Sequence, residues 1–81
     1  MKKYLYKKQD FVENIPTIRE LCGLSQAEFA ELIGIHRTTL NNIERGSQPL
    51  TQTVYLAIMC VVKDYIESGN TKLDKFINSD L

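Results

Sequence analysis

Two short stretches of helically spaced apolar residues, separated by Gly34, constrain this chain more than any other feature. The first stretch opens with Ser25 and Glu28 at the spacing of a capping box, in which each side chain accepts a backbone N–H bond from the other residue. It ends at Gly34, and the second stretch ends at Gly46. Because glycine adopts positive φ without steric cost, the pattern predicts two short helices joined by a tight turn.

This outline predicts a helix-turn-helix motif over residues 25–46. The motif needs a small residue where the two helices cross and a turn residue that is free to adopt positive φ. Ala30 and Gly34 meet these two demands. Apolar residues must also lock the helices together, and these positions hold Phe29, Ile33, Ile35, Leu40 and Ile43. Every position that the motif requires therefore carries a suitable residue type.

On the N-terminal side of the motif, we expect an arm followed by one helix. Residues 1–14 are expected to form an extended or partly helical arm. Residues 14–16 resemble a helix start, because Pro16 suits the first helical position, where its missing N–H has no partner to lose. Ile15 and Ile18 would then be buried, and Gly23 would end the helix.

On the C-terminal side, residues 50–81 predict one long and one short helix. The long helix would start at Leu50 or Thr51 and run to about Glu67, and the short one would cover residues 71–79. The long helix has two apolar stripes, one for the core and a second made of Tyr55, Met59, Val62 and Ile66. Because the second stripe also needs burial, we expect it to join Phe76, Ile77 and Leu81 in a homodimer interface.

Together these elements predict an all-α fold, a compact bundle of about five helices in a single domain over residues 1–81. The formal net charge is zero, which counts against a nucleic-acid-binding protein. Positive charge does gather near the N-terminus, at Lys2, Lys3, Lys7 and Lys8. These lysines fit a DNA-contacting arm or a solvated tail equally well.

Little in the sequence favours an enzyme, a metalloprotein or a membrane protein. There is one histidine and no nucleophile–base grouping, so we expect no catalytic activity, cofactor, metal or small-molecule substrate. Cys22 and Cys60 are not at metal-binding spacing, and both are expected to be reduced core thiols. With no signal peptide and no stretch long enough to span a membrane, a cytoplasmic location is expected.

Several of these residues resemble a known family. The pattern Gly23-Leu24-Ser25-Gln26, Phe29-Ala30, Gly34-Ile35, Thr39-Leu40 and Ile43-Glu44-Arg45-Gly46 resembles the Cro/repressor-type (lambda-repressor-like, XRE) DNA-binding family. The resemblance covers about residues 15–58. It implies a bundle of about five helices that binds double-stranded DNA operators as a dimer and regulates transcription.

The resemblance also implies a role for individual residues. The amide of Gln26 would hold a phosphate and support the first side chain of the recognition helix. The base-reading positions would be Arg37, Thr38 and Asn42. Thr39 and Asn41 lie beside them and are expected to contact phosphate or bases. Arg45, Ser47 and Gln48 match a region that contacts the DNA backbone. Arg19 and Glu44 match a buried structural ion pair.

The chemistry of these side chains agrees with such roles. Arginine can donate two hydrogen bonds to guanine, and asparagine can pair with adenine in the same bidentate way. Backbone N–H groups at helix N-termini contact phosphates without adding net charge. The zero net charge of the chain therefore counts less strongly against DNA binding. One departure from the family is His36, at the recognition-helix cap where serine or threonine is usual. It is either a tolerated surface residue or a phosphate contact.

The sequence therefore predicts a DNA-binding transcription regulator that reads a palindromic operator through the major groove. The alternative is a protein-interaction module on the same fold, such as an antitoxin or an accessory regulator, which the neutral charge and the doubly apolar long helix favour. The sequence leaves open the operator, the choice between repression and activation, and a phage, plasmid, restriction-modification or chromosomal role.

Overall fold

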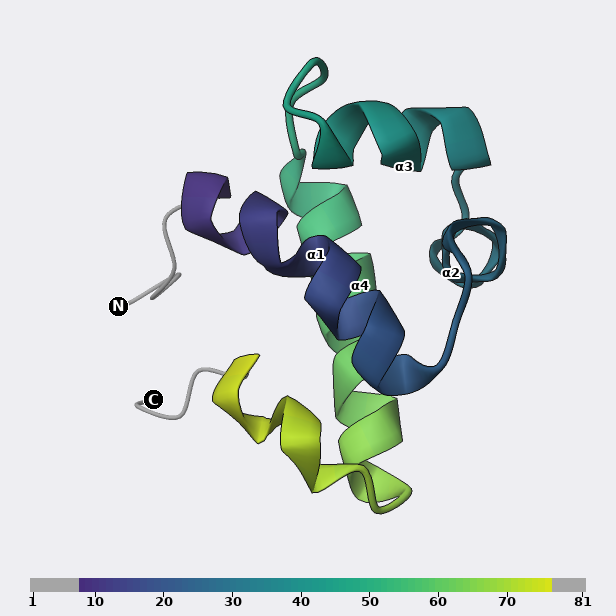
Figure 1. Cartoon of the computed structure of the whole chain (residues 1–81), viewed down its shortest axis with the longest axis vertical. Coiled ribbons are helices and arrows are strands. Elements are labelled where there is room, and N and C mark those ends of the chain that lie inside the picture. Colours follow the sequence, from purple (N-terminus) through teal and green to yellow (C-terminus); the bar gives the residue numbers. More distant parts are fainter. Residues whose placement is uncertain (1–7, 77–81) are drawn as a thin grey trace.

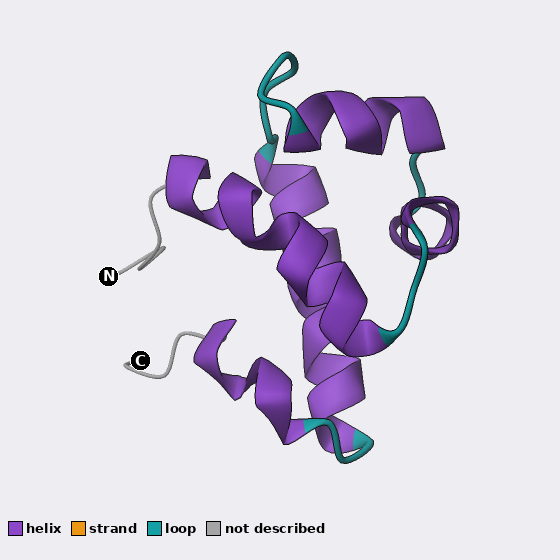
Figure 2. Cartoon of the chain, in the orientation of Figure 1, coloured by secondary structure: helices purple, strands orange, loops and turns teal. Residues whose placement is uncertain are grey.

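The computed structural model describes residues 8–76, and its elements there are all helical. They are α1 (Lys8–Cys22), α2 (Gln26–Ile33), α3 (Arg37–Glu44), α4 (Gln52–Glu67) and the 3-10 helix η1 (Thr71–Phe76) (Figure 1). Short loops join them, and no strand occurs within this range (Figure 2). The all-α prediction is confirmed, with four α-helices and a 3-10 helix where about five helices were expected.

Helix α1 begins at Lys8, so the prediction that it starts at residues 14–16 is wrong. Pro16 lies inside the helix, where it removes one backbone hydrogen bond and crowds the preceding turn. The helix continues through it because Phe11, Ile15 and Ile18 recur at helical spacing and are all fully buried. Burial of this face offsets the cost of the proline. Residues 8–14 are therefore part of the core helix, and the rest of the expected arm lies outside the described residues.

The local structure of the motif matches its prediction. Ser25 and Glu28 form the capping box, with bonds of 3.0 Å from the Glu28 N–H to Ser25 Oγ and 2.9 Å from the Ser25 N–H to Glu28 Oε1. Gly34 has a φ of 81°, which turns the chain between α2 and α3. Ala30 and four of the five locking residues are buried, and the fifth, Ile35, is half-buried.

Both apolar stripes of α4 are covered in part within one chain. The ring of Phe11 from α1 meets Tyr55 edge-on, with 4.8 Å between ring centroids. Helix η1 packs along the other part of α4, and Val62 and Phe76 are buried there (Figure 1). Among the described residues, intrachain contacts bury Val62 and partly cover Tyr55, Met59 and Ile66. The expectation that the second stripe joins a homodimer interface stays a prediction. Ile77 and Leu81, which were assigned to the same surface, lie outside the described residues.

The outward face of α4 carries Leu56, which is 49% exposed, and Cys60, which is also exposed. The expectation of a core thiol is therefore wrong for Cys60. It lies four residues after Leu56, on the helix face opposite the buried Ile58 and Val62. Cys22 is half-buried, and desolvation raises the pKa of its thiol above the ordinary value. A thiol of this kind is a poor nucleophile at neutral pH.

A polar contact that the sequence did not predict ties the turn before η1 to the C-terminal end of α1. The side-chain amide of Asn70 donates a 2.7 Å hydrogen bond to the carbonyl of Leu21, near the end of α1. This carbonyl is one of those that a helix end leaves without an intrahelical partner. Asn70 therefore caps α1 and fixes the turn between α4 and η1. None of the helices described is long and apolar enough to cross a membrane.

Candidate nucleic-acid interface

Helix α3 lies along one end of the molecule and packs against α2 and α1 (Figure 1). Its buried residues are Leu40 and Ile43, which face the core. Arg37 and Thr38 are exposed at its first turn, and Asn42 is half-buried one turn later. Because residues four apart share a helix face, Thr38 and Asn42 lie on one outward line. The three predicted base-reading residues are thus separate from the apolar lock.

A second outward line on the same helix is formed by Arg37, Asn41 and Arg45, again at intervals of four residues. Arg37 and Arg45 are exposed, and Asn41 is half-buried between them. Thr39 is half-buried, at the edge of the outward surface. The exposed side of α3 therefore has a positive charge at each end and neutral polar side chains between.

The start of α3 lacks a side-chain cap. His36 occupies the cap position with φ −74° and ψ 150°, yet its side chain makes no capping hydrogen bond. Serine or threonine there would accept a bond from a backbone N–H of the first turn. The exposed His36 leaves those N–H groups without a side-chain acceptor, at the end of the helix where the dipole attracts negative charge.

The other end of α3 is closed by residues 45–47. Gly46 turns the chain with φ 82°, and the Ser47 N–H donates a 2.9 Å bond to the carbonyl of Asn42. The Ser47 hydroxyl donates to the same carbonyl at 3.3 Å. Ser47 thus caps the C-terminus of α3, a structural task that the sequence reasoning did not assign to it. Gln48 follows half-buried in the loop.

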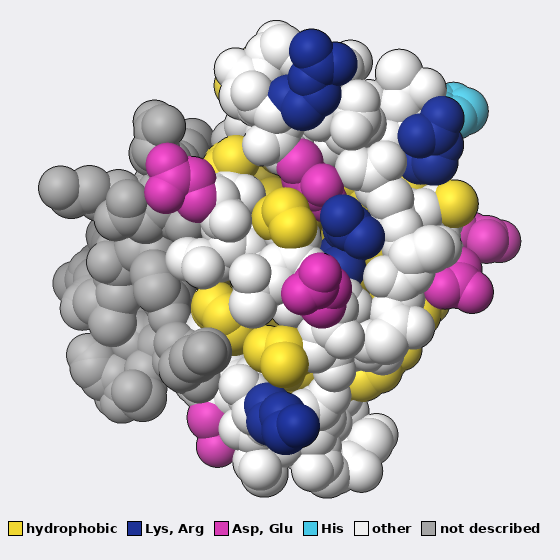
Figure 3. All heavy atoms as spheres, viewed as in Figure 1, with side chains coloured by type: hydrophobic (Ala, Val, Ile, Leu, Met, Phe, Trp, Pro, Cys, Tyr) yellow, Lys and Arg dark blue, Asp and Glu magenta, His cyan; other side chains and the backbone are white. Residues whose placement is uncertain are grey.

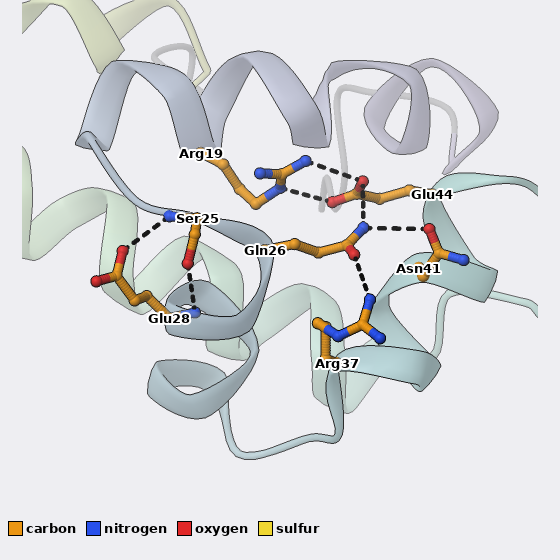
Figure 4. Close-up of polar contacts among 7 residues, drawn as sticks. All are labelled: Arg19, Ser25, Gln26, Glu28, Arg37, Asn41 and Glu44. Atoms are coloured by element: carbon orange, nitrogen blue, oxygen red, sulfur yellow. Dashed lines mark hydrogen bonds and ion pairs between the residues drawn. The ribbon is translucent and has the colours of Figure 1, made fainter.

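The structure brings Arg19 and Glu44 together between α1 and α3 (Figure 4). Arg19 Nε lies 2.8 Å from Glu44 Oε2, and Arg19 Nη2 lies 3.2 Å from Glu44 Oε1. The side chains are only 17% and 8% exposed. This two-point geometry orients both groups, and low exposure limits screening of the pair by solvent.

Gln26, at the start of α2, lies between this ion pair and Arg37 (Figure 4). Its Nε2 donates to Glu44 Oε1 at 3.0 Å and to Asn41 Oδ1 at 3.3 Å. Its Oε1 accepts from Arg37 Nη1 at 3.4 Å. Sequence reasoning placed Gln26 beside the first side chain of the recognition helix, but it missed the bonds to Asn41 and Glu44. No sequence signal shows them, because they depend on how the helices cross.

Charge on this end of the molecule is locally positive although the whole chain is neutral. Figure 3 shows basic side chains on the end formed by α3, next to the single histidine of the chain. Glu44, the one acidic residue within α3, is turned inward onto Arg19. The outward surface of α3 therefore presents arginine without a competing carboxylate from its own helix.

We expect Glu44→Ala to lower the free energy of unfolding by about 1–3 kcal/mol, because it leaves the Arg19 guanidinium without its ionic partner in a poorly hydrated position. Thermal unfolding followed by circular dichroism measures this as a fall in Tm of about 5–15 °C. Glu31→Ala is the control, since Glu31 is exposed on α2. Equal Tm values for the two variants would contradict a structural role for the pair.

Comparison with known proteins decides the family of this chain. The helix-turn-helix family model matches residues 17–61, which is more than half of the chain and contains α2, α3 and their turn. The chain belongs to the XRE-type helix-turn-helix family. Members of this family are DNA-binding transcription regulators, and α3 is the second helix of the motif.

One curated relative, control protein C.SmaI of Serratia marcescens, is 31% identical to this helix-turn-helix protein over 51 residues. The aligned region covers 63% of the present chain and 61% of the relative, so the chain spans less than two thirds of that protein. No solved structure gives a significant match. Among the residues described, no group of histidine, cysteine and acidic side chains is placed to hold a metal ion.

Proposed function

We propose that this protein is a sequence-specific transcription regulator that binds a palindromic operator through the major groove. Arg37, Thr38 and Asn42 would read bases, with Arg37 donating to guanine and Asn42 pairing with adenine. Backbone contacts would come from Gln26, the first turn of α3 at His36, and the segment from Arg45 to Gln48. Thr39 and Asn41 lie at the margins of this surface. The proposal places the protein in the cytoplasm, with its DNA.

The observation that carries the proposal is the division of α3 into two faces. Leu40 and Ile43 are buried, while Thr38 and Asn42 lie on the opposite side of the helix and Arg37 is exposed at its first turn. A helix held in this way can enter the major groove without exposing the core. The name of the relative, a control protein, supports a regulatory role over the alternative of an antitoxin or accessory module.

Selection of bound duplexes from a random DNA pool tests the proposal. We expect a palindrome to emerge, and we expect affinity for the selected duplex to fall steeply as salt rises, because each neutralised phosphate releases counterions. Recovery of no sequence, together with binding that is weak and insensitive to salt, would contradict DNA binding. A protein-interaction module on the same fold would then be the better interpretation.

We further propose a homodimer formed through the C-terminal half, because a palindrome requires two recognition helices about 34 Å apart. Since the second stripe of α4 packs in part against the core of its own chain, the more exposed outward face of α4 around Leu56 is our candidate for the contact. Analytical ultracentrifugation at micromolar concentration should give a dimer, and Leu56→Glu should shift it toward monomer.

Leu32→Glu is the matched control for this dimer test, since Leu32 is 54% exposed but lies on α2 within the motif. It should leave the association unchanged. A monomer in the unmodified protein, with and without DNA, would contradict the dimer. If Leu32→Glu abolished the dimer and Leu56→Glu did not, the dimer interface would lie on the helices of the motif instead.

A further inference from the structure

We infer that Glu44 is a positioning residue for the recognition of DNA bases. It fixes the amide of Gln26, which in turn holds the guanidinium of Arg37. The inference rests on the proposed function, in which Arg37 reads a base. It gives Glu44 a second task beside its ion pair with Arg19. The contacts that carry it run from Arg19 on α1 to Glu44 at the end of α3, then through Gln26 on α2 to Arg37 at the start of α3 (Figure 4).

The surroundings of the Gln26 amide allow only one orientation. Its NH₂ group faces two acceptors, a carboxylate oxygen of Glu44 at 3.0 Å and the amide oxygen of Asn41 at 3.3 Å. Its oxygen faces the Arg37 guanidinium. Rotation of the amide by 180° would set oxygen against carboxylate and NH₂ against guanidinium. Because each contact would then be repulsive, Glu44 decides which end of Gln26 meets Arg37.

The neutral amide suits the task of holding an arginine that must still bind DNA. A carboxylate in its place would neutralise Arg37, whereas Gln26 orients the guanidinium and leaves its positive charge intact. Only Nη1 is used, and among residues 8–76 the Arg37 side chain has no other hydrogen-bond partner. Nε and Nη2 therefore remain available for the two acceptors of guanine.

Glu44 can impose this orientation because it is itself held at two points. Arg19 engages both carboxylate oxygens, and Glu44 Oε1 accepts from Gln26 as well. Without the carboxylate, the NH₂ group of Gln26 would keep only the longer contact to Asn41. We therefore expect removal of Glu44 to release Arg37 to alternative rotamers and to weaken its discrimination between bases.

The test measures a specificity ratio, the Kd for a scrambled duplex divided by the Kd for the duplex selected from the random pool. Partial unfolding scales both dissociation constants equally, so the ratio is insensitive to stability. In Glu44→Ala we expect the ratio to fall about three- to tenfold, the effect of losing one or two oriented hydrogen bonds. Gln26→Ala should lower it as much, and the double variant should lower it no further, because Glu44 acts through Gln26.

Two variants separate positioning from stability. Glu44→Gln keeps an acceptor oxygen for Gln26 but loses the charge that pairs with Arg19, so its Tm should fall while its ratio stays within about twofold of the parent. Asn70→Ala removes the distant bond to the Leu21 carbonyl. The Asn70→Ala variant should have a lower Tm and an unchanged specificity ratio.

A ratio that is unchanged in Glu44→Ala, while the parent protein discriminates strongly, would overturn the positioning role and leave the proposed function standing. Additive losses in the double variant would also overturn it. A parent ratio near one would mean that the proposed function itself fails. NMR then still tests the contacts: the side-chain NH₂ signals of Gln26 should shift in Glu44→Ala and remain in place in Asn70→Ala.

Discussion

Replacing Phe11 with alanine is expected to lower the free energy of unfolding by about 3–5 kcal/mol, the usual cost of deleting a fully buried aromatic ring. Phe11 is 1% exposed, packs edge-on against Tyr55, and belongs to the same core as Ile15 and Ile18. Small domains have total stabilities of about 5–15 kcal/mol, so this loss is a large part of the whole. Thermal unfolding should show a fall in Tm of more than about 10 °C.

Glu13→Ala is the matched control for this prediction, since Glu13 lies two residues further along α1 and is exposed. Its free energy of unfolding should change by less than about 0.5 kcal/mol. If Phe11→Ala were as stable as Glu13→Ala, residues 8–14 would behave as the separate arm that the sequence suggested. The pair of variants therefore tests the largest difference between the expected fold and the structure.

The elements that could be predicted from the sequence are those set by local chemistry. The capping box at Ser25 and Glu28 and the turn at Gly34 each depend on residues within one helical turn. Such signals are the same wherever the helix packs. The helix-turn-helix motif could be predicted because its lock is a fixed spacing of apolar residues around one glycine.

The errors lie where packing between distant segments overrides a local signal. Pro16 is a good helix start, but burial of Phe11 and Ile15 extends α1 beyond it. In α4 nearly every residue from Val54 to Val62 is apolar, so periodicity does not show which face points outward. The structure points Leu56 and Cys60 outward, a result decided by where α1, α2 and η1 contact this helix.

The candidate site divides in the same way. Spacing alone puts Arg37, Thr38 and Asn42 on a helix surface away from Leu40 and Ile43. The hydrogen bonds that join Gln26 to Asn41 and Glu44 are not visible in the sequence, because they link side chains 15 and 18 residues apart through a helix crossing. The helix that carries a residue could be used to infer which side of the molecule its side chain faces. The hydrogen bonds that hold the side chain in place could be found only in the tertiary structure.

Arg37→Ala is expected to weaken binding to the selected duplex about tenfold or more and to relax the preference at one base pair, a G·C pair by the chemistry of the guanidinium. A bidentate contact to guanine contributes roughly 1–3 kcal/mol of discrimination, which sets the size of the effect. Folding should be preserved, because Arg37 is exposed and lies outside the core. Titration of the variant against selected and scrambled duplexes at one fixed salt concentration measures both effects.

Arg45→Ala is the matched control, since Arg45 is also exposed and lies at the other end of α3. As a backbone contact it should weaken binding to both duplexes alike and reduce the salt dependence by about one unit of slope. If Arg37→Ala behaved in the same way, Arg37 would be a phosphate contact and Gln26 would hold it toward the DNA backbone. If neither variant altered binding, α3 would not face DNA, and a protein partner would be the better candidate for this surface.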